Sequence, residues 1–294
     1  MLSIKNLSKT YDNGVRALHN VSLEIPNGMF GLLGPNGAGK SSLMRTLATL
    51  QPADSGAVKL GDIDVLNNKN ELRKYLGYLP QEFGVYPDIS ALAMLTHLAV
   101  LKGISNAKER GEIVEYLLHM TNLWEARKRK LITYSGGMRQ RFGIAQALLG
   151  EPRLIIVDEP TAGLDPEERR RFLNLLSEIG EDVVIILSTH IVEDVGEICA
   201  NMAIIEKGQV RYTGAPRSAV AALEGFIWER VIDKTDVHHY EDTFKLISKR
   251  LFAGQIMVHI HSENRPGEGF QPVKPDLEDA YFTHLYKDMH TADG

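Results

Sequence analysis

Short, continuous runs of apolar residues recur along the chain at residues 29–33, 154–157 and 183–187, and the last two consist of large aliphatic residues. The first run predicts a strand, and the two aliphatic runs predict strands that are buried on both faces, as the strands of a parallel sheet usually are. Segments with helical spacing of apolar residues separate them, and helices are expected at residues 40–50, 90–102, 110–121, 137–149 and 166–179. This alternation of strands and helices predicts an α/β fold built on a parallel sheet.

A change in composition separates the last quarter of the chain from the rest. Two further strands are expected there, at residues 226–232 and 255–260, together with a final helix near Asp276. Between the two strands, apolar residues recur with the spacing i, i+4, i+7 and i+11, which predicts another helix. These residues are Tyr240, Phe244, Ile247 and Leu251. We therefore expect a small α/β accessory domain over residues 217–294, joined to a larger domain over residues 1–216.

The overall composition is that of an ordinary globular protein. The chain has 294 residues, of which 44% are hydrophobic and 24% are charged. A net charge of −5 argues against a protein whose main task is to coat nucleic acid, and we expect no nucleic-acid partner. The single cysteine, Cys199, excludes an intrachain disulfide and a cysteine-based zinc site, and it favours a reducing compartment.

No stretch of the sequence approaches the roughly 20 apolar residues that a membrane-spanning helix needs. The first residues also lack the charged start, apolar run and small-residue cleavage site of a secretory signal. We therefore expect a cytoplasmic protein that reaches a membrane only as a peripheral subunit on its cytosolic face.

The strongest chemical motif is a glycine-rich loop between the first buried strand and the helix that follows it. Residues 34–41 match the phosphate-binding pattern G-x-x-x-x-G-K-[ST] in full. Such a loop wraps an anion with its backbone N–H groups, and the N-terminus of the next helix adds its dipole. Lys40 is expected to bridge the β- and γ-phosphates, and Ser41 to bind Mg²⁺ through its hydroxyl. The predicted nucleotide-binding residues of this segment are Gly34, Pro35, Asn36, Gly37, Ala38, Gly39, Lys40, Ser41 and Ser42.

A pair of carboxylates ends the buried strand at 154–157. Asp158 stands at the strand end, where a carboxylate reaches the Mg²⁺ shell, and Glu159 follows directly, placed to polarise an attacking water. The pair therefore indicates nucleotide hydrolysis. Guanine specificity is disfavoured, because the nearest match to Asn-Lys-x-Asp, residues 68–71, ends in glutamate.

Two segments near this pair decide which class of nucleotide-binding protein is expected. Tyr134–Arg141 reads Tyr-Ser-Gly-Gly-Met-Arg-Gln-Arg, and Asp158–Asp165 reads Asp-Glu-Pro-Thr-Ala-Gly-Leu-Asp. With these segments the chain resembles the nucleotide-binding subunits of ABC transporters, whose signature is Leu-Ser-Gly-Gly-Gln. Six motifs occur here in that family's order: phosphate loop, glutamine loop, signature, Asp-Glu strand, D-loop and switch histidine. The resemblance covers about residues 1–215. It implies a P-loop NTPase with a RecA-like core, an antiparallel β subdomain and a helical subdomain at about residues 82–136.

The resemblance assigns chemistry to residues outside the phosphate loop. It implies catalytic roles for Glu159, Gln81 and His190, and an Mg²⁺ site formed by Ser41, Gln81 and Asp158. For Gln81 the alternative is an ordinary loop glutamine, and for His190 an ordinary histidine at a strand end.

Further residues are expected to bind ATP by the same resemblance. Tyr11 is similar to the aromatic residue that stacks on adenine, with a tyrosine at the edge of the core as the alternative. Contact with the ATP held by a partner subunit is implied for Ser135, Gly136, Gly137 and Asp165. Asp165 could otherwise only cap the helix that follows it. The signature departs from the family at Tyr134 and Met138. Because the three residues between them are intact, we expect the ATP contact to survive and only its fine positioning to differ.

The resemblance also implies partners. In this family two ATPase subunits, identical or related, close head to tail around two ATP molecules and drive a separate integral-membrane permease. Residues 275–282 are similar to the ending of many bacterial export-type subunits, which favours an exporter. A non-transport ABC ATPase that acts on ribosomes or DNA is the alternative; the single cassette and the lack of a long heptad region disfavour it. A small-molecule kinase is disfavoured as well, because such an enzyme does not need the signature segment.

Two other clusters have simpler interpretations. The basic run at residues 127–130 could meet lipid headgroups or nucleic acid, but a solvated helix end is the favoured interpretation. His238, His239, His259 and His261 could suggest a metal, yet no carboxylate or cysteine pattern accompanies them.

Overall fold

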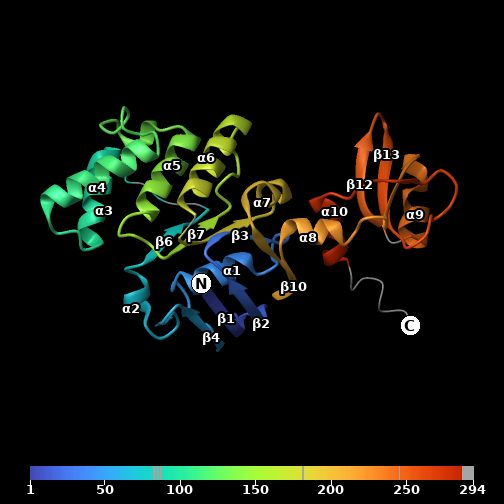
Figure 1. Ribbon diagram of the computed structural model, residues 1–294, viewed down its shortest axis with the longest axis horizontal. Coiled ribbons are helices and arrows are strands. Elements are labelled where there is room, and N and C mark those ends of the chain that lie inside the picture. The colour runs from blue at the N-terminus through green and yellow to red at the C-terminus, as the bar shows by residue number, and fades with distance from the viewer. Residues whose placement is uncertain (82–83, 85, 87, 181, 245, 287–294) are drawn as a thin grey trace.

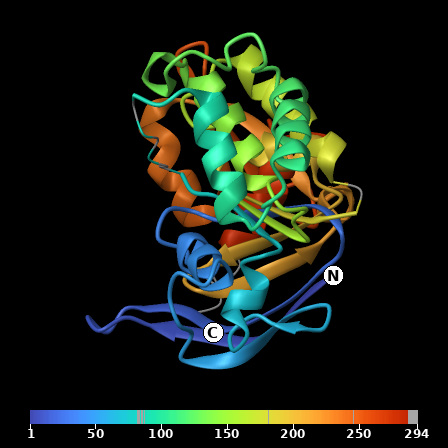
Figure 2. The same ribbon diagram turned by 90° about the vertical axis from the view of Figure 1, so that its left-hand side faces the viewer.

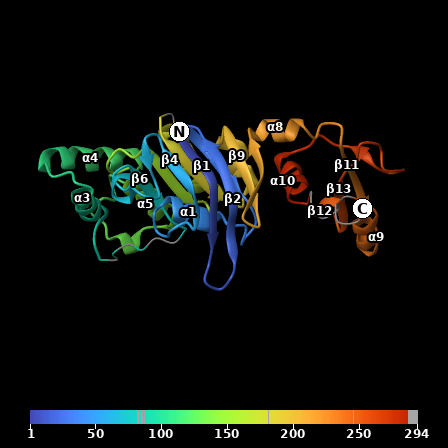
Figure 3. The same cartoon turned by 90° about the horizontal axis from the view of Figure 1, so that it is seen from below.

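The computed structural model describes residues 1–81, 84, 86, 88–180, 182–244 and 246–286. These residues form a larger body, which contains the parallel sheet, and a smaller body near the C-terminus (Figure 1). The helices α8 (Pro216–Ala221) and α10 (Leu277–Leu285) lie between the two bodies (Figure 3).

A six-stranded sheet lies at the centre of the larger body, with strand order β10-β9-β3-β8-β7-β6. Its strands are β3 (Gly28–Leu33), β6 (Leu76–Leu79), β7 (Leu154–Asp158), β8 (Val184–Thr189), β9 (Asn201–Glu206) and β10 (Gln209–Gly214). All neighbouring pairs are parallel except β9 and β10. Asp158 pairs with Ser188 across β7 and β8, so the carboxyl ends of these strands lie side by side. The predicted parallel sheet is thus confirmed.

A second, antiparallel sheet covers one side of the body, with strand order β2-β1-β4-β5. Its strands are β1 (Leu2–Thr10), β2 (Arg16–Ile25), β4 (Ser55–Leu60) and β5 (Ile63–Asp64). The helix α1 (Lys40–Leu47) lies between the two sheets, and its Leu43, Met44 and Leu47 share one core with both of them (Figure 2). This layer holds the phosphate loop, which leads into α1, against a rigid support.

Helices cover the opposite face of the parallel sheet and extend beyond it. The elements are α3 (Ala91–Leu101), α4 (Ala107–Met120), η1 (Leu131–Thr133), α5 (Gly136–Ala147), α6 (Pro166–Ile179) and α7 (Val192–Ile198). The short helix α2 (Lys69–Leu72) lies instead on the side of the antiparallel sheet, where Leu72 packs into the core shared with α1. Residues of α3, α4 and α5 form a core of their own, centred on Leu95, Leu118 and Phe142. This core contains the helices of the predicted helical subdomain and extends past its predicted end near residue 136, because α5 contributes Phe142. Residues 82, 83, 85 and 87, where that subdomain was expected to begin, lie outside the described residues.

The smaller body is an antiparallel sheet with strand order β12-β13-β11-β14, packed against one helix. Its elements are β11 (Ile227–Ile232), η2 (Lys234–Asp236), α9 (Val237–Thr243), β12 (Leu246–Phe252), β13 (Gln255–His261) and β14 (Gln271–Pro272). Val258 and Ile260 of β13 pack on Tyr240 and Phe270, with Phe244 beside them. The predicted strands and the small α/β character of this region are confirmed.

The helix predicted from Tyr240 through Leu251 is wrong in its second half. The chain leaves the helix after Thr243 and continues as a strand, in which Leu251 pairs with Ile256 of β13. The reason is the tight turn at Ala253 and Gly254, whose φ angles of 47° and 89° suit a two-residue hairpin. The hairpin fixes the preceding residues as a strand, and Leu251 is 68% exposed instead of facing a core.

The final helix begins as predicted, with Asp276 as its N-cap and a capping box between Asp276 and Asp279. It packs against α7, α8 and the β9–β10 pair of the larger body as well as against β12 of the smaller one. Ala280 and Tyr281 are buried in the core of the larger body. No described helix is both long and apolar enough to cross a bilayer.

Candidate functional site

A cavity of about 580 Å³ opens where the phosphate loop joins α1. Its wall contains residues 35–42 of the loop together with Tyr11, Gln81, Glu159 and His190. These residues come from five separate segments of the chain. The cavity lies at the carboxyl ends of the parallel strands, where ligands of open α/β sheets usually bind.

Glycine is required in the phosphate loop by close approach and by backbone conformation. Gly39 has a φ of 107°, and a Cβ there would stand 2.4 Å from the carbonyl oxygen of Ala17. A Cβ on Gly34 would stand 2.4 Å from the carbonyl oxygen of Ile205. Because side chains cannot fit, the loop packs directly on the neighbouring backbone and turns sharply into α1.

Lys40 reaches back over the loop from the first turn of α1. Its ammonium donates to the carbonyl oxygens of Gly34 at 2.6 Å and Pro35 at 3.3 Å, and it is 3.7 Å from the carboxylate of Glu159. Burial lowers the pKa of Lys40, and the charges of Glu159 and Asp158 oppose that shift. This ammonium places a positive charge against the phosphate loop.

Asp158 lies at the end of β7 and is only 5% exposed. Burial raises the pKa of Asp158, and the charge of Glu159 acts in the same direction while Lys40 opposes it. Within the described residues, its Oδ1 atom has no hydrogen-bond partner, and the Ser41 hydroxyl lies close to the same carboxylate. A buried carboxylate oxygen without a donor, beside a hydroxyl, suits a hard cation, and these residues therefore fit Mg²⁺.

Glu159 has a left-handed backbone, with a φ of 51°, and its N–H donates to the carbonyl oxygen of Ser188 at 2.8 Å. Its carboxylate contacts the Nδ1 atom of His190 at 2.5 Å on one side and faces Lys40 on the other. His190 is about half exposed, whereas Glu159 is buried. The structure thus brings Glu159, His190 and Lys40 into one group, with Gln81 exposed on the same wall.

Tyr11 and Ser42 are joined at the rim of the cavity. The two hydroxyls are 2.9 Å apart, and the hydroxyl of Tyr11 also donates to Gln51 at 3.1 Å. Tyr11 is 36% exposed, so its ring remains available for stacking while its hydroxyl is held. Ser42 therefore supports Tyr11 in this structure.

The second set of predicted nucleotide contacts lies outside this cavity. Among the described residues, its lining does not include Ser135, Gly136, Gly137 or Asp165. Ser135 is the N-cap of α5, and Asp165 is the N-cap of α6, each accepting from a backbone N–H of the first turn. The helix-capping alternative for Asp165 is therefore realised in the single chain.

The two departures from the family signature face the interior. Tyr134 is 2% exposed in the core of the helical subdomain, and its hydroxyl donates to the carbonyl oxygen of Ala126 at 3.0 Å. Met138 is partly buried and packs against the same core. These substitutions therefore change packing beneath the signature rather than its exposed backbone.

Arg16 and Lys207 also line the cavity, and neither was among the site residues predicted from the sequence. Lys207 belongs to a tight turn between β9 and β10, with φ angles of 48° there and 74° at Gly208. The N–H of Gly208 donates to the carbonyl oxygen of Ala38 at 2.8 Å, so this turn supports the phosphate loop. The Lys-Gly dipeptide between two strands was the available signal.

A family model described as "ABC transporter" matches residues 18–162. The linearmycin resistance ATP-binding protein LnrL of Bacillus subtilis (strain 168) is 34% identical over 230 residues, which cover 76% of this chain and 72% of that protein. The chain belongs to the ATP-binding proteins of ABC transporters. This ABC ATPase therefore binds and hydrolyses ATP as the subunit that powers a membrane transporter, which confirms the predicted fold class and function.

The similarity of this ABC ATPase reaches into the smaller body. The daunorubicin/doxorubicin resistance ATP-binding protein DrrA of Streptomyces peucetius is 31% identical over 267 residues, covering 90% of this chain and 78% of that protein. A solved dimeric ATP-binding cassette in a post-hydrolysis state, bound to ADP and phosphate, superposes with a TM-score of 0.66 and 28% identity. It covers 73% of this chain and 98% of that one.

The clusters that the sequence analysis set aside have local partners. Arg127 stacks on the ring of Trp124 at 3.8 Å, and Lys130 pairs with Asp88 at 2.9 Å. His259 is buried and contacts Asp279 at 2.7 Å. Within the described part of the chain, no group of three or more potential ligands could hold a metal ion.

Proposed function

We propose that this ABC ATPase closes head to tail with a second subunit around two Mg²⁺-bound ATP molecules and thereby drives an export permease. One observation supports the proposed dimer. The cavity contains the phosphate loop and Glu159, while Ser135 and Asp165 stand outside it at helix N-termini. A second subunit that presents its own Ser135 segment would complete each cavity, since helix N-termini favour phosphate.

Ser41, Asp158 and Gln81 would hold Mg²⁺ in each site. The ion, when bound, neutralises charge on the phosphate oxygens. The free Oδ1 atom of Asp158 and the adjacent Ser41 hydroxyl support this assignment. Gln81 is exposed on the same wall of the cavity, and its side-chain oxygen would serve as a further ligand.

Glu159 would orient the attacking water and accept its proton, and His190 would hold Glu159 and contact the γ-phosphate. The 2.5 Å contact between the two side chains supports a joint role. Lys40 would bind the β- and γ-phosphates. Its hydrogen bonds to the loop carbonyl groups hold the ammonium at the loop, where phosphate oxygens would replace those carbonyl groups as its partners. Tyr11, with its ring partly exposed at the rim, would stack on adenine.

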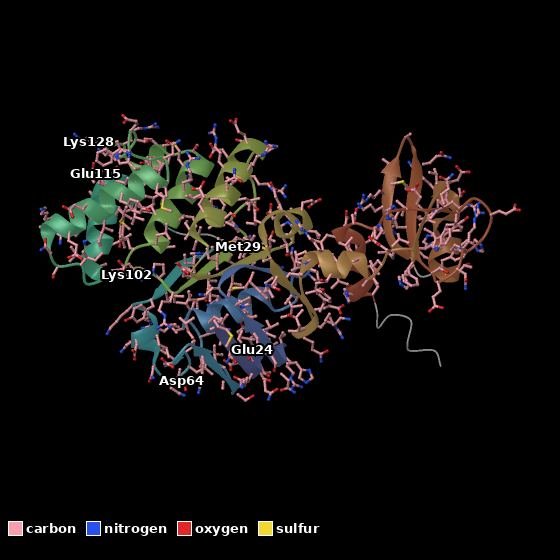
Figure 4. All side chains as sticks on the ribbon, in the orientation of Figure 1. Glu24, Met29, Asp64, Lys102, Glu115 and Lys128 are labelled. Atoms are coloured by element: carbon pink, nitrogen blue, oxygen red, sulfur yellow. The ribbon has the colours of Figure 1, made fainter. Side chains whose placement is uncertain are left out.

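A groove of about 310 Å³ between β6 and the end of α3 supports the permease partner. It is lined by apolar and polar residues that include Tyr78, Leu98, Leu101 and Gln146, and Leu101 is 70% exposed. Lys102, labelled in Figure 4, also lines the groove and donates to the carbonyl oxygen of Leu76 at 2.8 Å. A cytoplasmic segment of the permease would dock here, at the junction of the helical subdomain with the sheet.

Export is supported by the named relatives. LnrL and DrrA are both named as resistance ATP-binding proteins, and the similarity to DrrA extends over 90% of this chain. In this proposal the permease selects the cargo, and no cargo-binding pocket is assigned to the ATPase chain. The ATPase would work at the cytosolic face of the membrane.

Two measurements test the proposal. Glu159→Gln with ATP is expected to elute as a dimer in size-exclusion chromatography, whereas the same variant with Ser135→Arg remains a monomer. Affinity purification from native membranes is expected to recover a multi-span protein at near-equal stoichiometry. Recovery of ribosomal or DNA-repair proteins without such a partner would contradict the transporter assignment.

A further inference from the structure

Asp194 of α7 is a fully buried carboxylate that lies outside the nucleotide cavity. It is 0% exposed, and both of its oxygens are engaged at short distance. Oδ2 accepts from the hydroxyl of Thr161 at 2.6 Å, and Oδ1 accepts from the Nε atom of Arg169 at 2.6 Å. Burying a charged carboxylate costs desolvation free energy. We therefore expect Asp194 to have a role beyond filling space in the core.

The partners of Asp194 come from the segments that carry the proposed catalytic residues. Thr161 is two residues after Glu159, and it is only 3% exposed. Arg169 lies on α6, where its N–H donates to the carbonyl oxygen of Asp165 at 2.9 Å. Asp194 itself lies four residues after His190. One carboxylate therefore joins the Glu159 segment, the start of α6 and the segment that follows His190.

Two links connect the same pair of segments. The exposed link is the contact of Glu159 with His190 inside the cavity. The buried link is the hydrogen bond from Thr161 to Asp194 behind it. Because the buried link is shielded from water, it fixes the spacing on which the exposed contact depends.

Glu159 needs such support because its backbone is strained. A φ of 51° places a residue with a Cβ in the left-handed region, which persists only where the surroundings enforce it. The N–H of Glu159 is held by Ser188 on one side. On the C-terminal side of Glu159, the buried side chain of Thr161 is held by its hydrogen bond to Asp194.

We propose that Asp194 is a positioning residue for ATP hydrolysis: through Thr161 and Arg169 it holds Glu159 and the Asp165 cap in register with His190. The inference rests on the proposed role of Glu159. It predicts that loss of the Thr161 hydroxyl slows the chemical step and leaves ATP binding intact, because among the described residues the side chain of Asp194 is hydrogen-bonded to Thr161 and Arg169 and not to the phosphate loop.

Thr161→Val tests the proposal, since valine keeps the shape and removes only the hydroxyl. We expect kcat to fall about 10- to 100-fold, as for a small misplacement of a catalytic group, while KM for ATP changes less than about 3-fold. Thr161→Ser should restore turnover. The matched control is Thr121→Val, because Thr121 is 1% exposed and its hydroxyl donates to Leu117 in the helical subdomain. The control should keep wild-type kcat.

A double-mutant cycle separates positioning from a structural role. In a Glu159→Gln background, Thr161→Val should cause no further loss of turnover, because its effect passes through Glu159. Additive losses, or a Thr161→Val kcat within about 2-fold of wild type, would overturn the inference. A crystal structure of Thr161→Val in which residue 159 keeps its left-handed φ would overturn it as well. Asp194→Asn provides the same readouts if Thr161→Val does not fold.

The two proposals fail in different ways. If Glu159→Gln alone keeps wild-type turnover, the proposed role of Glu159 is wrong, and with it this inference. If Glu159→Gln loses turnover while Thr161→Val does not, only the positioning role of Asp194 is wrong.

Discussion

Replacing Asp279 by asparagine is expected to remove a pH dependence from the stability of the C-terminal part of the chain. Asp279 lies on α10 and is 0% exposed; its Oδ1 atom is 2.7 Å from Nδ1 of His259 on β13. The hydrogen bond to Asp279 raises the pKa of His259, and burial opposes the shift. Glu229 faces the other ring nitrogen at 3.8 Å, the charge of Asp276 also raises this pKa, and Arg250 lowers it.

The raised pKa sets the direction of the effect. The folded chain holds the proton of His259 more tightly than the unfolded chain does, whose histidine has a pKa of about 6.5. The added stability is therefore complete below pH 6.5 and is lost as the pH rises through the folded-state pKa. A hydrogen bond between charged groups contributes about 1.5–3 kcal/mol. Since the side chains of His259 and Asp279 are 7% and 1% exposed, screening by water takes little from this figure.

The assay is urea unfolding between pH 5.5 and pH 9, followed by tryptophan fluorescence. The chain has two tryptophans, Trp124 and Trp228, and Trp228 lies on β11 of the smaller body. In a Trp124→Phe background, the signal reports on the part of the chain that Asp279 holds. Asp279→Asn should lower stability at pH 6 by about 1.5–3 kcal/mol and by clearly less at pH 9. His97→Gln, which changes an exposed histidine, is the control. An equal loss at both pH values would refute the reasoning.

Three further predictions concern the nucleotide site and the single thiol. Glu159→Gln should lower kcat by about 10²–10⁴-fold while ATP still binds, as measured by turnover and by equilibrium titration; normal turnover would contradict the role of Glu159. Lys40→Ala should weaken ATP binding about 10- to 100-fold, because it removes a charged donor to the phosphates, and unchanged affinity would speak against the loop assignment. Burial raises the pKa of Cys199 to about 12, so a thiol reagent at pH 8 should label the folded chain on the order of 10³-fold more slowly than the chain in urea. Equal labelling rates would show that this thiol is accessible.

The sequence determined the elements and motifs whose signals are local. Continuous aliphatic runs predicted the parallel strands because strands covered on both faces exclude polar residues. The phosphate loop was readable because close backbone approach at Gly39 admits only glycine. The capping box at Asp276 was likewise encoded within four residues.

Periodicity misled the analysis where two patterns overlapped. Tyr240, Phe244, Ile247 and Leu251 satisfy helical spacing, yet only the first part is helical. The hairpin that begins at Ala253 decided the second part, because pairing with β13 supplies the backbone hydrogen bonds that a longer helix would otherwise have made.

Only the tertiary structure decided which of the motif residues meet. It brought Glu159, His190 and Lys40 together from three segments, and it left Ser135 and Asp165 outside their cavity. It also revealed Asp194, which no local pattern distinguishes from a surface acid at the start of a helix. Distances between segments depend on how sheets and helices pack over the whole chain, and no window of sequence contains that information.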